Sequence, residues 1–238
     1  MLIVKNLIKK YKDFVALKGI SYQVNDGEIF GILGPNGAGK STMIKILTCF
    51  HKPTSGEVII SGIPIDKKED IKKLIGWVPQ EDTFYPSLTI EENLEYFASL
   101  YDLKKKDYKK KISDLLDILQ IANKKNSLAG SLSGGMKRRL SMAIALVHNP
   151  QVIYLDEPTA GVDPVSRRSI WDAIRKIKSM GLTVIFCTHY LDEADILCDR
   201  IAILRSGEII ASGTPKELKK KSKNLEEAFI RIVKNENN

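Results

Sequence analysis

The sequence predicts an α/β fold with a mainly parallel sheet, an N-terminal antiparallel β subdomain and an inserted helical subdomain. Apolar runs of strand length alternate with helical patterns through much of the chain, which is typical of a parallel central sheet. From about residue 81 to residue 149 the pattern becomes helical. With 238 residues, of which 43% are hydrophobic, the chain is long enough for one substantial core.

Two kinds of strand are expected, and they differ in how their apolar residues are arranged. Residues 20–24 alternate between apolar and polar, as in a half-exposed antiparallel strand, and residues 58–60, followed by the turn pair Ser61-Gly62, are interpreted as the same kind of strand. Three other runs are apolar on both faces, as buried parallel strands are, and we expect them together in the core sheet: residues 28–33, 152–155 and 183–187.

Helix signals fill the segment between the two halves of this core. Thr89 and Glu92 form a capping box, in which each side chain binds the backbone N–H of the other residue. Apolar residues then repeat at helical spacing in two groups: Ile112, Leu115, Leu116 and Leu119, followed by Leu140, Ala143, Ile144 and Val147.

The last part of the chain predicts a hairpin and a further helix. Residues 201–204 and 208–211 flank the turn pair Ser206-Gly207, and Thr214-Pro215-Lys216-Glu217 has the pattern of a helix start. We therefore expect one domain with three parts: an α/β core of residues 1–80 and 150–214, a helical subdomain of residues 81–149 and a C-terminal helical tail of residues 215–238.

The charge balance and the cysteines narrow the class of protein. Lys and Arg number 37 against 29 Asp and Glu, a net charge of +8 that suits a phosphorylated ligand, anionic lipid or nucleic acid. The lysine runs 104–106, 109–111 and 219–221 lie beside apolar residues at helical spacing, so we interpret them as solvated helix faces and expect no nucleic-acid partner. Three cysteines without paired spacing are interpreted as small buried apolar side chains: Cys49, Cys187 and Cys198.

The sequence contains no signal for membrane insertion or secretion. No run approaches the roughly 18 apolar residues that a membrane-spanning helix needs. The first residues lead into a short apolar segment without the long hydrophobic region and cleavage site of a secretory signal. We therefore expect the chain in the cytoplasm.

A glycine-rich segment directly after residues 28–33 has the pattern of a phosphate-binding loop. It reads Gly34-Pro35-Asn36-Gly37-Ala38-Gly39-Lys40-Ser41, and an amphipathic helix follows; the next residue, Thr42, is included in the predicted site. Glycines allow backbone N–H groups to converge on phosphate oxygens, and a helix N-terminus favours negative charge. Lys40 is expected to reach the β- and γ-phosphates of a nucleotide, and Ser41 to ligate Mg²⁺.

An acidic partner for the magnesium ion is expected at the end of a neighbouring apolar strand. Asp156 follows residues 152–155 and fits that role. Glu157 comes next, where its carboxylate could polarise a water molecule aimed at the γ-phosphate. The alternative is a functionless acidic loop before Pro158, which the phosphate loop upstream disfavours.

A further motif resembles the signature of the ATP-binding-cassette (ABC) ATPases: Leu132-Ser133-Gly134-Gly135-Met136. At the start of a predicted helix, its serine and glycines would offer a hydroxyl, accessible backbone N–H groups and the positive helix end to an anion. The resemblance runs from Tyr11 to about Leu218 and implies that the nucleotide is ATP. It also implies that two cassettes pack head to tail, with each ATP between the phosphate loop of one and the signature of the other.

The same resemblance implies roles for single residues elsewhere. Tyr11 resembles the aromatic residue that stacks on adenine, and Gln80 the loop glutamine that touches magnesium and responds to the membrane subunit. Asp163 belongs to the loop that crosses the dimer interface, and it could also cap the helix that starts at Pro164. His189, after the strand at residues 183–187, resembles the switch histidine that hydrogen-bonds the γ-phosphate.

Met136 departs from the glutamine most common in the signature. Residues 136–140, 190–194 and 198–202 are similar to those of a bacterial export subfamily for drugs, lipids, polysaccharides and antibiotic peptides. The resemblance implies a separate membrane-spanning subunit, a second ATPase subunit, and peripheral attachment to the inner face of the cell membrane. Alternatives are an importer ATPase and an ABC-type ATPase acting on ribosomes or DNA, although one copy of each motif in 238 residues is untypical of the latter. A GTPase is disfavoured because residues 123–126 lack the aspartate of a guanine-reading motif.

Overall fold

The computed structural model describes residues 1–101 and 103–235 of the chain. Two compact units divide it: unit 1 consists of Met1–Lys72 and Thr183–Asn238, and unit 2 of Lys73–Leu182. Helix α2 (Lys68–Leu74) crosses the boundary between them. Of the tail expected at residues 215–238, residues 236–238 lie outside the described part.

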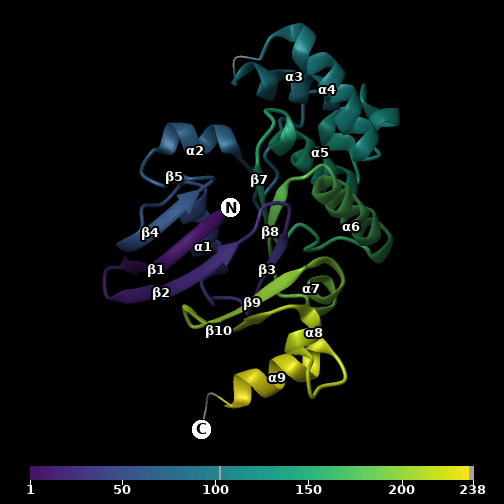
Figure 1. Cartoon of the computed structure of the whole chain (residues 1–238). Helices are drawn as coiled ribbons and strands as arrows, with labels where there is room; N and C mark the ends of the chain where they lie inside the picture. Colours follow the sequence, from purple (N-terminus) through teal and green to yellow (C-terminus); the bar gives the residue numbers. More distant parts are fainter. Residues whose placement is uncertain (102, 236–238) are drawn as a thin grey trace. The chain divides into compact units, whose positions relative to one another are not determined.

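Unit 1 begins with an antiparallel sheet in the strand order β2-β1-β4-β5 (Figure 1). Its strands are β1 (Leu2–Tyr11), β2 (Phe14–Val24), β4 (Ser55–Ile60) and β5 (Ile63–Pro64). The turn between β4 and β5 has positive φ at both central residues, 50° at Ser61 and 80° at Gly62, as a type I′ hairpin turn requires. The antiparallel N-terminal sheet predicted from alternation is confirmed.

The second sheet of unit 1 is mainly parallel. Strand β3 (Ile29–Leu33) lies between β8 (Thr183–Thr188) and β9 (Arg200–Arg205) and runs parallel to both. Every residue of β3 and β8 is buried, as runs that are apolar on both faces predicted. The predicted hairpin is also present, because β10 (Glu208–Gly213) pairs with β9 in antiparallel fashion.

The helices of unit 1 follow its strands. Helix α1 (Lys40–Leu47) comes after the β3 loop, α7 (Leu191–Leu197) after β8, and α8 (Pro215–Leu218) and α9 (Leu225–Asn235) after β10. The Thr214 hydroxyl accepts from the Glu217 N–H at 3.2 Å, and the Glu217 carboxylate accepts from the Thr214 N–H at 2.7 Å. The capping signal at the start of α8 is therefore confirmed.

Unit 2 combines a parallel strand pair with the helical segment. Strand β6 (Ile75–Val78) pairs with β7 (Val152–Asp156), and the helices are α3 (Ile90–Ser99), α4 (Lys105–Ile118), α5 (Gly134–Leu146) and α6 (Pro164–Ser179), with short 3-10 turns at Ala122–Lys124 and Ala129–Ser131. The capping box at Thr89 is present, and both predicted apolar groups are buried. Within the described residues, no helix has both the length and the apolar character needed to cross a lipid bilayer.

The three cysteines are buried, as the sequence predicted. Burial raises the pKa of the Cys49 and Cys198 thiols, so both stay protonated at neutral pH. They behave as small apolar side chains of the core.

Candidate functional site

The phosphate loop connects β3 to α1, and its glycines determine its shape. Gly37 and Gly39 have φ of 80° and 110°, in the left-handed region that glycine adopts without strain. A Cβ atom at Gly34 would lie 2.2 Å from the Leu204 carbonyl oxygen, so a side chain there would push the loop away from β9. A Cβ at Gly37 would meet nothing within 4 Å, which leaves this part of the backbone open to a ligand.

Lys40 is buried at the first position of α1 and is 5% exposed. Its ammonium donates hydrogen bonds to the carbonyl oxygens of Gly34 (2.8 Å) and Pro35 (3.1 Å), so the side chain folds back over the loop. Ser41 and Thr42 follow, both half-buried, and the first turn of α1 contains no acidic residue. The loop thus places a fixed positive charge at a helix N-terminus, which suits a polyanion such as a nucleotide's phosphate chain.

His189 lies beside this loop. A cavity of about 270 Å³ is lined by Gly34, Pro35 and Asn36 of the phosphate loop and by His189, together with Leu33, Leu191 and Phe229. Unit 1 therefore brings the histidine predicted from the resemblance next to the predicted phosphate site. Phe229 of α9 was not identified from the sequence, because an apolar residue in a C-terminal helix carries no motif.

The segment around His189 is held by hydrogen bonds of its neighbours. The Thr188 hydroxyl donates to the Glu193 carboxylate at 3.0 Å and accepts from the Tyr190 N–H at 2.9 Å. These contacts fix the turn from β8 into α7, and with it the backbone that carries His189.

Tyr11 ends β1 and is 38% exposed. The Lys9 ammonium lies 4.8 Å from its ring centroid, and the His51 ring meets it edge-on with centroids 5.9 Å apart. Burial and the charges of Lys9 and Lys45 lower the pKa of His51, so this ring is neutral at physiological pH. A base stacking on Tyr11 would have these two side chains as neighbours, and no sequence motif singles out either one.

In unit 2, Asp156 is the last residue of β7, and Gln80 follows the end of β6, the strand paired with β7. Strands β6 and β7 are parallel, with Val78 opposite Leu155, so their carboxyl ends lie at the same edge of the pair. Asp156 is 5% exposed at the end of β7, whereas Gln80 is exposed two residues after β6. Both offer oxygen atoms of the kind that Mg²⁺ prefers, and the third predicted ligand, Ser41, belongs to unit 1.

Glu157 has an uncommon backbone conformation. Its φ of 48° lies in the left-handed region, which a glutamate rarely adopts, and the residue is 7% exposed. The Ala160 N–H donates to the Glu157 carbonyl oxygen at 3.1 Å and closes the turn after β7. Such conformations cost on the order of 1–3 kcal/mol and often occur at active sites. A buried glutamate with a fixed backbone position after β7 fits a catalytic base, and the sequence could not show its conformation.

The signature segment forms the N-terminus of α5, where its two glycines differ. The Ser133 hydroxyl caps the helix by accepting from the Met136 N–H at 3.4 Å. A Cβ at Gly134 would meet nothing within 4 Å, whereas a Cβ at Gly135 would lie 2.5 Å from Cβ of Ser166 in α6. Gly134 is therefore open to a ligand, and Gly135 allows α5 to pack against α6.

Asp163 caps α6 beside this contact, as the sequence predicted. Its carboxylate accepts from the Val165 and Ser166 N–H groups at 3.0 Å each. Hydrogen bonds with Ser166 hold the pKa of Asp163 below its ordinary value, so the cap is ionised at neutral pH. Ser166 therefore contacts both Asp163 of the predicted interface loop and Gly135 of the signature segment.

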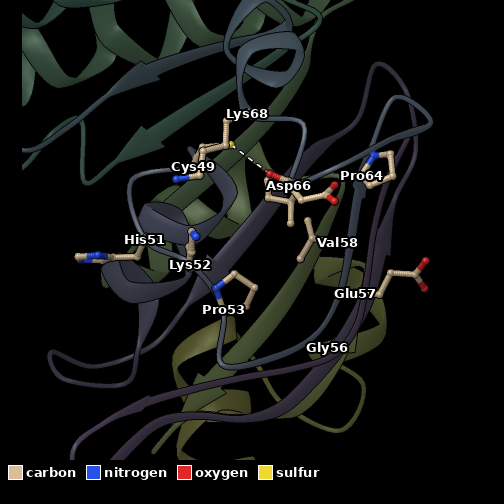
Figure 2. A pocket seen from close by; sticks show the side chains of 11 residues that line it. Cys49, His51, Lys52, Pro53, Gly56, Glu57, Val58, Pro64, Asp66 and Lys68 are labelled. Atoms are coloured by element: carbon tan, nitrogen blue, oxygen red, sulfur yellow. Dashed lines mark hydrogen bonds between the residues drawn. The ribbon is translucent and has the colours of Figure 1, made fainter.

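A larger hollow of about 750 Å³ in unit 1 contains none of the predicted site residues (Figure 2). Its lining carries both charge signs, from Glu57 and Asp66 and from Lys52 and Lys68. The Cys49 sulfur is directed at the Ile65 carbonyl oxygen, 3.8 Å away. Because its charges are mixed, this hollow has no evident preference for a polyanion, and the phosphate loop remains the candidate site.

Comparison with known proteins identifies the family. The family profile described as ABC transporter matches residues 17–160. The chain is 40% identical over 239 residues to the probable multidrug ABC transporter ATP-binding protein YbhF of Escherichia coli K12, covering 96% of this chain and 41% of YbhF. It is 40% identical over 211 residues to the Nod factor export ATP-binding protein I of Burkholderia thailandensis, covering 88% of this chain and 69% of that protein.

A solved structure is similar over most of its length. It is the dimeric ATP-binding cassette MJ0796 in a post-hydrolysis state, bound to ADP and Pi, with 32% identity and a TM-score of 0.80 over 90% of this chain and 98% of that one. The chain spans 41% of the length of YbhF. The predicted fold class is confirmed, and the chain belongs to the ABC transporter family as an ATP-binding cassette.

Proposed function

We propose that this chain binds and hydrolyses ATP as the motor subunit of an ABC transporter, and that two cassettes close around two ATP molecules to drive export. The observation that carries the proposal is the phosphate loop of unit 1. There, left-handed Gly37 and Gly39 and the buried Lys40 ammonium form a cradle with fixed positive charge. ATP is the polyanion that the family membership favours.

Magnesium fits the donor atoms that the chain provides. The Ser41 hydroxyl, the Gln80 amide and the Asp156 carboxylate are hard oxygen donors, which suit Mg²⁺ and not a soft metal. When bound with ATP, the ion would neutralise charge that develops on the phosphates. Asp156 is buried at the end of β7, directly before Glu157, so these two acidic residues lie at the same strand end.

Two further residues act on the γ-phosphate in this proposal. The Glu157 carboxylate accepts a proton from the attacking water, and His189 hydrogen-bonds the γ-phosphate from the wall of the 270 Å³ cavity that also includes Asn36. Tyr11 stacks on the adenine ring. These assignments follow the family resemblance residue by residue.

The second cassette completes the site. Ser133, Gly134 and the start of α5 form an open helix N-terminus that would receive the γ-phosphate of ATP bound to the other chain, and Asp163 lies on the same interface. The dimeric MJ0796 cassette bound to ADP and Pi supports this arrangement. We propose either two copies of this chain or one copy with a different cassette.

Export is favoured over import because the relatives support it. The Nod factor export protein matches over most of its length, and YbhF is named for multidrug transport. In this proposal the substrate passes through a separate membrane-spanning subunit, and the cassette attaches to the cytoplasmic face of the membrane. Neither ribosomes nor nucleic acid are expected as partners.

Purification of the tagged chain from its own cells tests this function. After detergent solubilisation we expect a membrane-spanning protein to co-purify, and the complex to hydrolyse ATP in preference to GTP. Reconstitution in vesicles should then show ATP-dependent movement of substrate in the export direction. Co-purification with ribosomes, or equal hydrolysis of GTP, would contradict the proposal.

A further inference from the structure

Arg138 of α5 is a buried residue to which the sequence assigned no role. It contacts the loop that follows β6 and contains Pro79 and Gln80, the Gln80 loop. The residue is 8% exposed. One terminal nitrogen of its guanidinium donates to the Pro79 carbonyl oxygen at 2.7 Å, and the other donates to the Gln80 carbonyl oxygen. A single side chain therefore binds two successive carbonyl groups of the loop that carries the predicted magnesium ligand.

The buried charge of Arg138 has carbonyl and carboxylate groups around it. Burial lowers the pKa of the guanidinium, and the carboxylates of Asp82 and Asp156 act in the opposite direction. An arginine nevertheless stays charged at physiological pH. A buried charge requires partners, and the two carbonyls and the nearby carboxylates supply them.

Two more contacts attach α5 and the residues directly after it to β6. The His148 ring nitrogen Nε2 lies 2.9 Å from the Ile75 carbonyl oxygen. Gly76 packs so closely on α5 that a Cβ there would lie 2.2 Å from the Ala145 carbonyl oxygen. With Arg138 as the third contact, strand β6 is fixed to this segment from its first residue to the loop beyond its end.

We propose that Arg138 is a positioning residue that fixes the Gln80 loop to the signature helix, so that Gln80 and the Ser133–Gly134 cradle move as one body. A movement imposed on the Gln80 loop would then shift the start of α5, which in the proposed function receives the γ-phosphate of the ATP bound to the other cassette. The inference rests on the proposed function for the roles of Gln80 and Ser133. The hydrogen bonds of Arg138 lie wholly within unit 2.

Arg139 offers a matched control from the same helix. Its guanidinium also binds backbone carbonyls, those of Gly135 (3.3 Å), Leu119 (3.2 Å) and Gln120 (3.1 Å), and so attaches α5 to the end of α4. Removal of either arginine takes away at least two hydrogen bonds and one charge, which is buried in Arg138 and half-buried in Arg139. Of these two arginines, Arg138 is the one whose hydrogen bonds reach the Gln80 loop.

A double-mutant cycle distinguishes positioning from general stabilisation. Arg138→Met and Gln80→Ala are each expected to lower kcat about tenfold, with KM for ATP changed less than about twofold. If Arg138 acts through Gln80, the kcat of the double variant should lie within about twofold of the kcat of Gln80→Ala alone. The effects of Arg139→Met and Gln80→Ala should multiply. Multiplicative effects for Arg138→Met and Gln80→Ala would overturn the proposal.

Metal binding gives a second readout that needs no turnover. With a non-hydrolysable ATP analogue, Mn²⁺ affinity measured by electron paramagnetic resonance should fall several-fold in Arg138→Met and stay unchanged in Arg139→Met. Arg138→Lys should be intermediate, because one ammonium cannot reproduce the two-pronged contact of a guanidinium, and it serves if Arg138→Met does not fold. Unchanged Mn²⁺ affinity in both Arg138 variants would contradict the proposal. Retained ATP affinity in Lys40→Ala would instead contradict the proposed function.

Discussion

The phosphate loop of unit 1 and the signature segment of unit 2 are both glycine-containing helix starts, but they differ in charge and in how they are held. The phosphate loop has the buried Lys40 ammonium and two left-handed glycines. The signature has a serine cap and an open Gly134, and the nearby Lys137 ammonium lies 6.0 Å from the Phe84 ring centroid. In the proposed function the phosphate loop holds a phosphate chain by itself, whereas the signature segment adds contacts to a nucleotide that is already bound.

In the proposed function the two units also separate most of the ATP binding from the proton transfer. Unit 1 holds the phosphate loop and Tyr11, which bind ATP, together with His189, and unit 2 holds the carboxylates of Asp156 and Glu157. Changes in the phosphate loop should therefore lower ATP affinity, and changes at Glu157 should lower turnover with little effect on affinity.

Glu157→Gln should have the largest effect on turnover. The amide keeps the shape of the side chain but cannot accept a proton, so kcat should fall about 100- to 10,000-fold. The dissociation constant for ATP should change less than about threefold, since the charge that binds phosphate lies in unit 1. Phosphate release and equilibrium binding measure the two quantities. Near-normal turnover would show that the base lies elsewhere, and exposed Glu226→Gln is the control.

Lys40→Ala should act mainly on ATP binding, in contrast to Glu157→Gln, which should act mainly on turnover. Loss of charge-assisted hydrogen bonds to the β- and γ-phosphates should weaken ATP binding on the order of 100-fold. Equilibrium dialysis with labelled ATP measures this, with Lys45→Ala on the same helix as control. An ATP affinity equal to that of the wild type would refute the assignment of the phosphate loop.

Gly134→Ala and Gly135→Ala should differ although the residues are neighbours. A methyl group on Gly134 meets no atom of the chain and favours helix, so stability should hold or rise by up to about 1 kcal/mol. Turnover should still fall about tenfold if a partner phosphate approaches there. Gly135→Ala should lower stability by about 1–3 kcal/mol, because the methyl group collides with Ser166. Urea denaturation and ATPase assays compare them, and normal turnover in Gly134→Ala would contradict a role for the cradle.

The capping boxes of the two units should give the smallest effects. Thr89→Ala should lower the free energy of unfolding by about 1 kcal/mol, and Thr214→Ala by less, because α8 has only four residues. Hydrogen bonds to Thr89 and Thr214 hold the pKa of Glu92 and Glu217 below the ordinary value of 4.5. This stabilisation is present above pH 4.5 and is lost as the pH falls through the lowered pKa values. Denaturant titrations at pH 7 and pH 3 test this, and a pH-independent difference between Thr89→Ala and the wild type would contradict it.

Local patterns predicted much of the fold because their causes are local. Apolarity on both faces identified β3 and β8, and the caps at Thr89, Asp163 and Thr214 depend on residues two or three positions away. The contacts of Arg138 could not be predicted in this way. They join positions 58 and 59 residues apart and depend on how α5 packs against β6.

The same limit applies to the candidate site. Gly134 and Gly135 are identical in the sequence, and only the packing of α6 shows that one is open and the other is covered. Phe229 lies beside His189 because the chain returns after β10, a long-range contact without a sequence motif. Residue types and spacing predict which chemistry is present, while tertiary packing determines which neighbours support it.

ATPase activity per molecule as a function of protein concentration tests the shared site most directly. If ATP is hydrolysed between the phosphate loop of one chain and Ser133–Gly134 of another, activity per molecule should rise with concentration and vanish on dilution. Ser133→Arg should retain ATP binding as a monomer and lose turnover, because a bulky cation fills the cradle. Activity per molecule that stays constant from nanomolar to micromolar concentration, in a sample shown to be monomeric, would contradict the account.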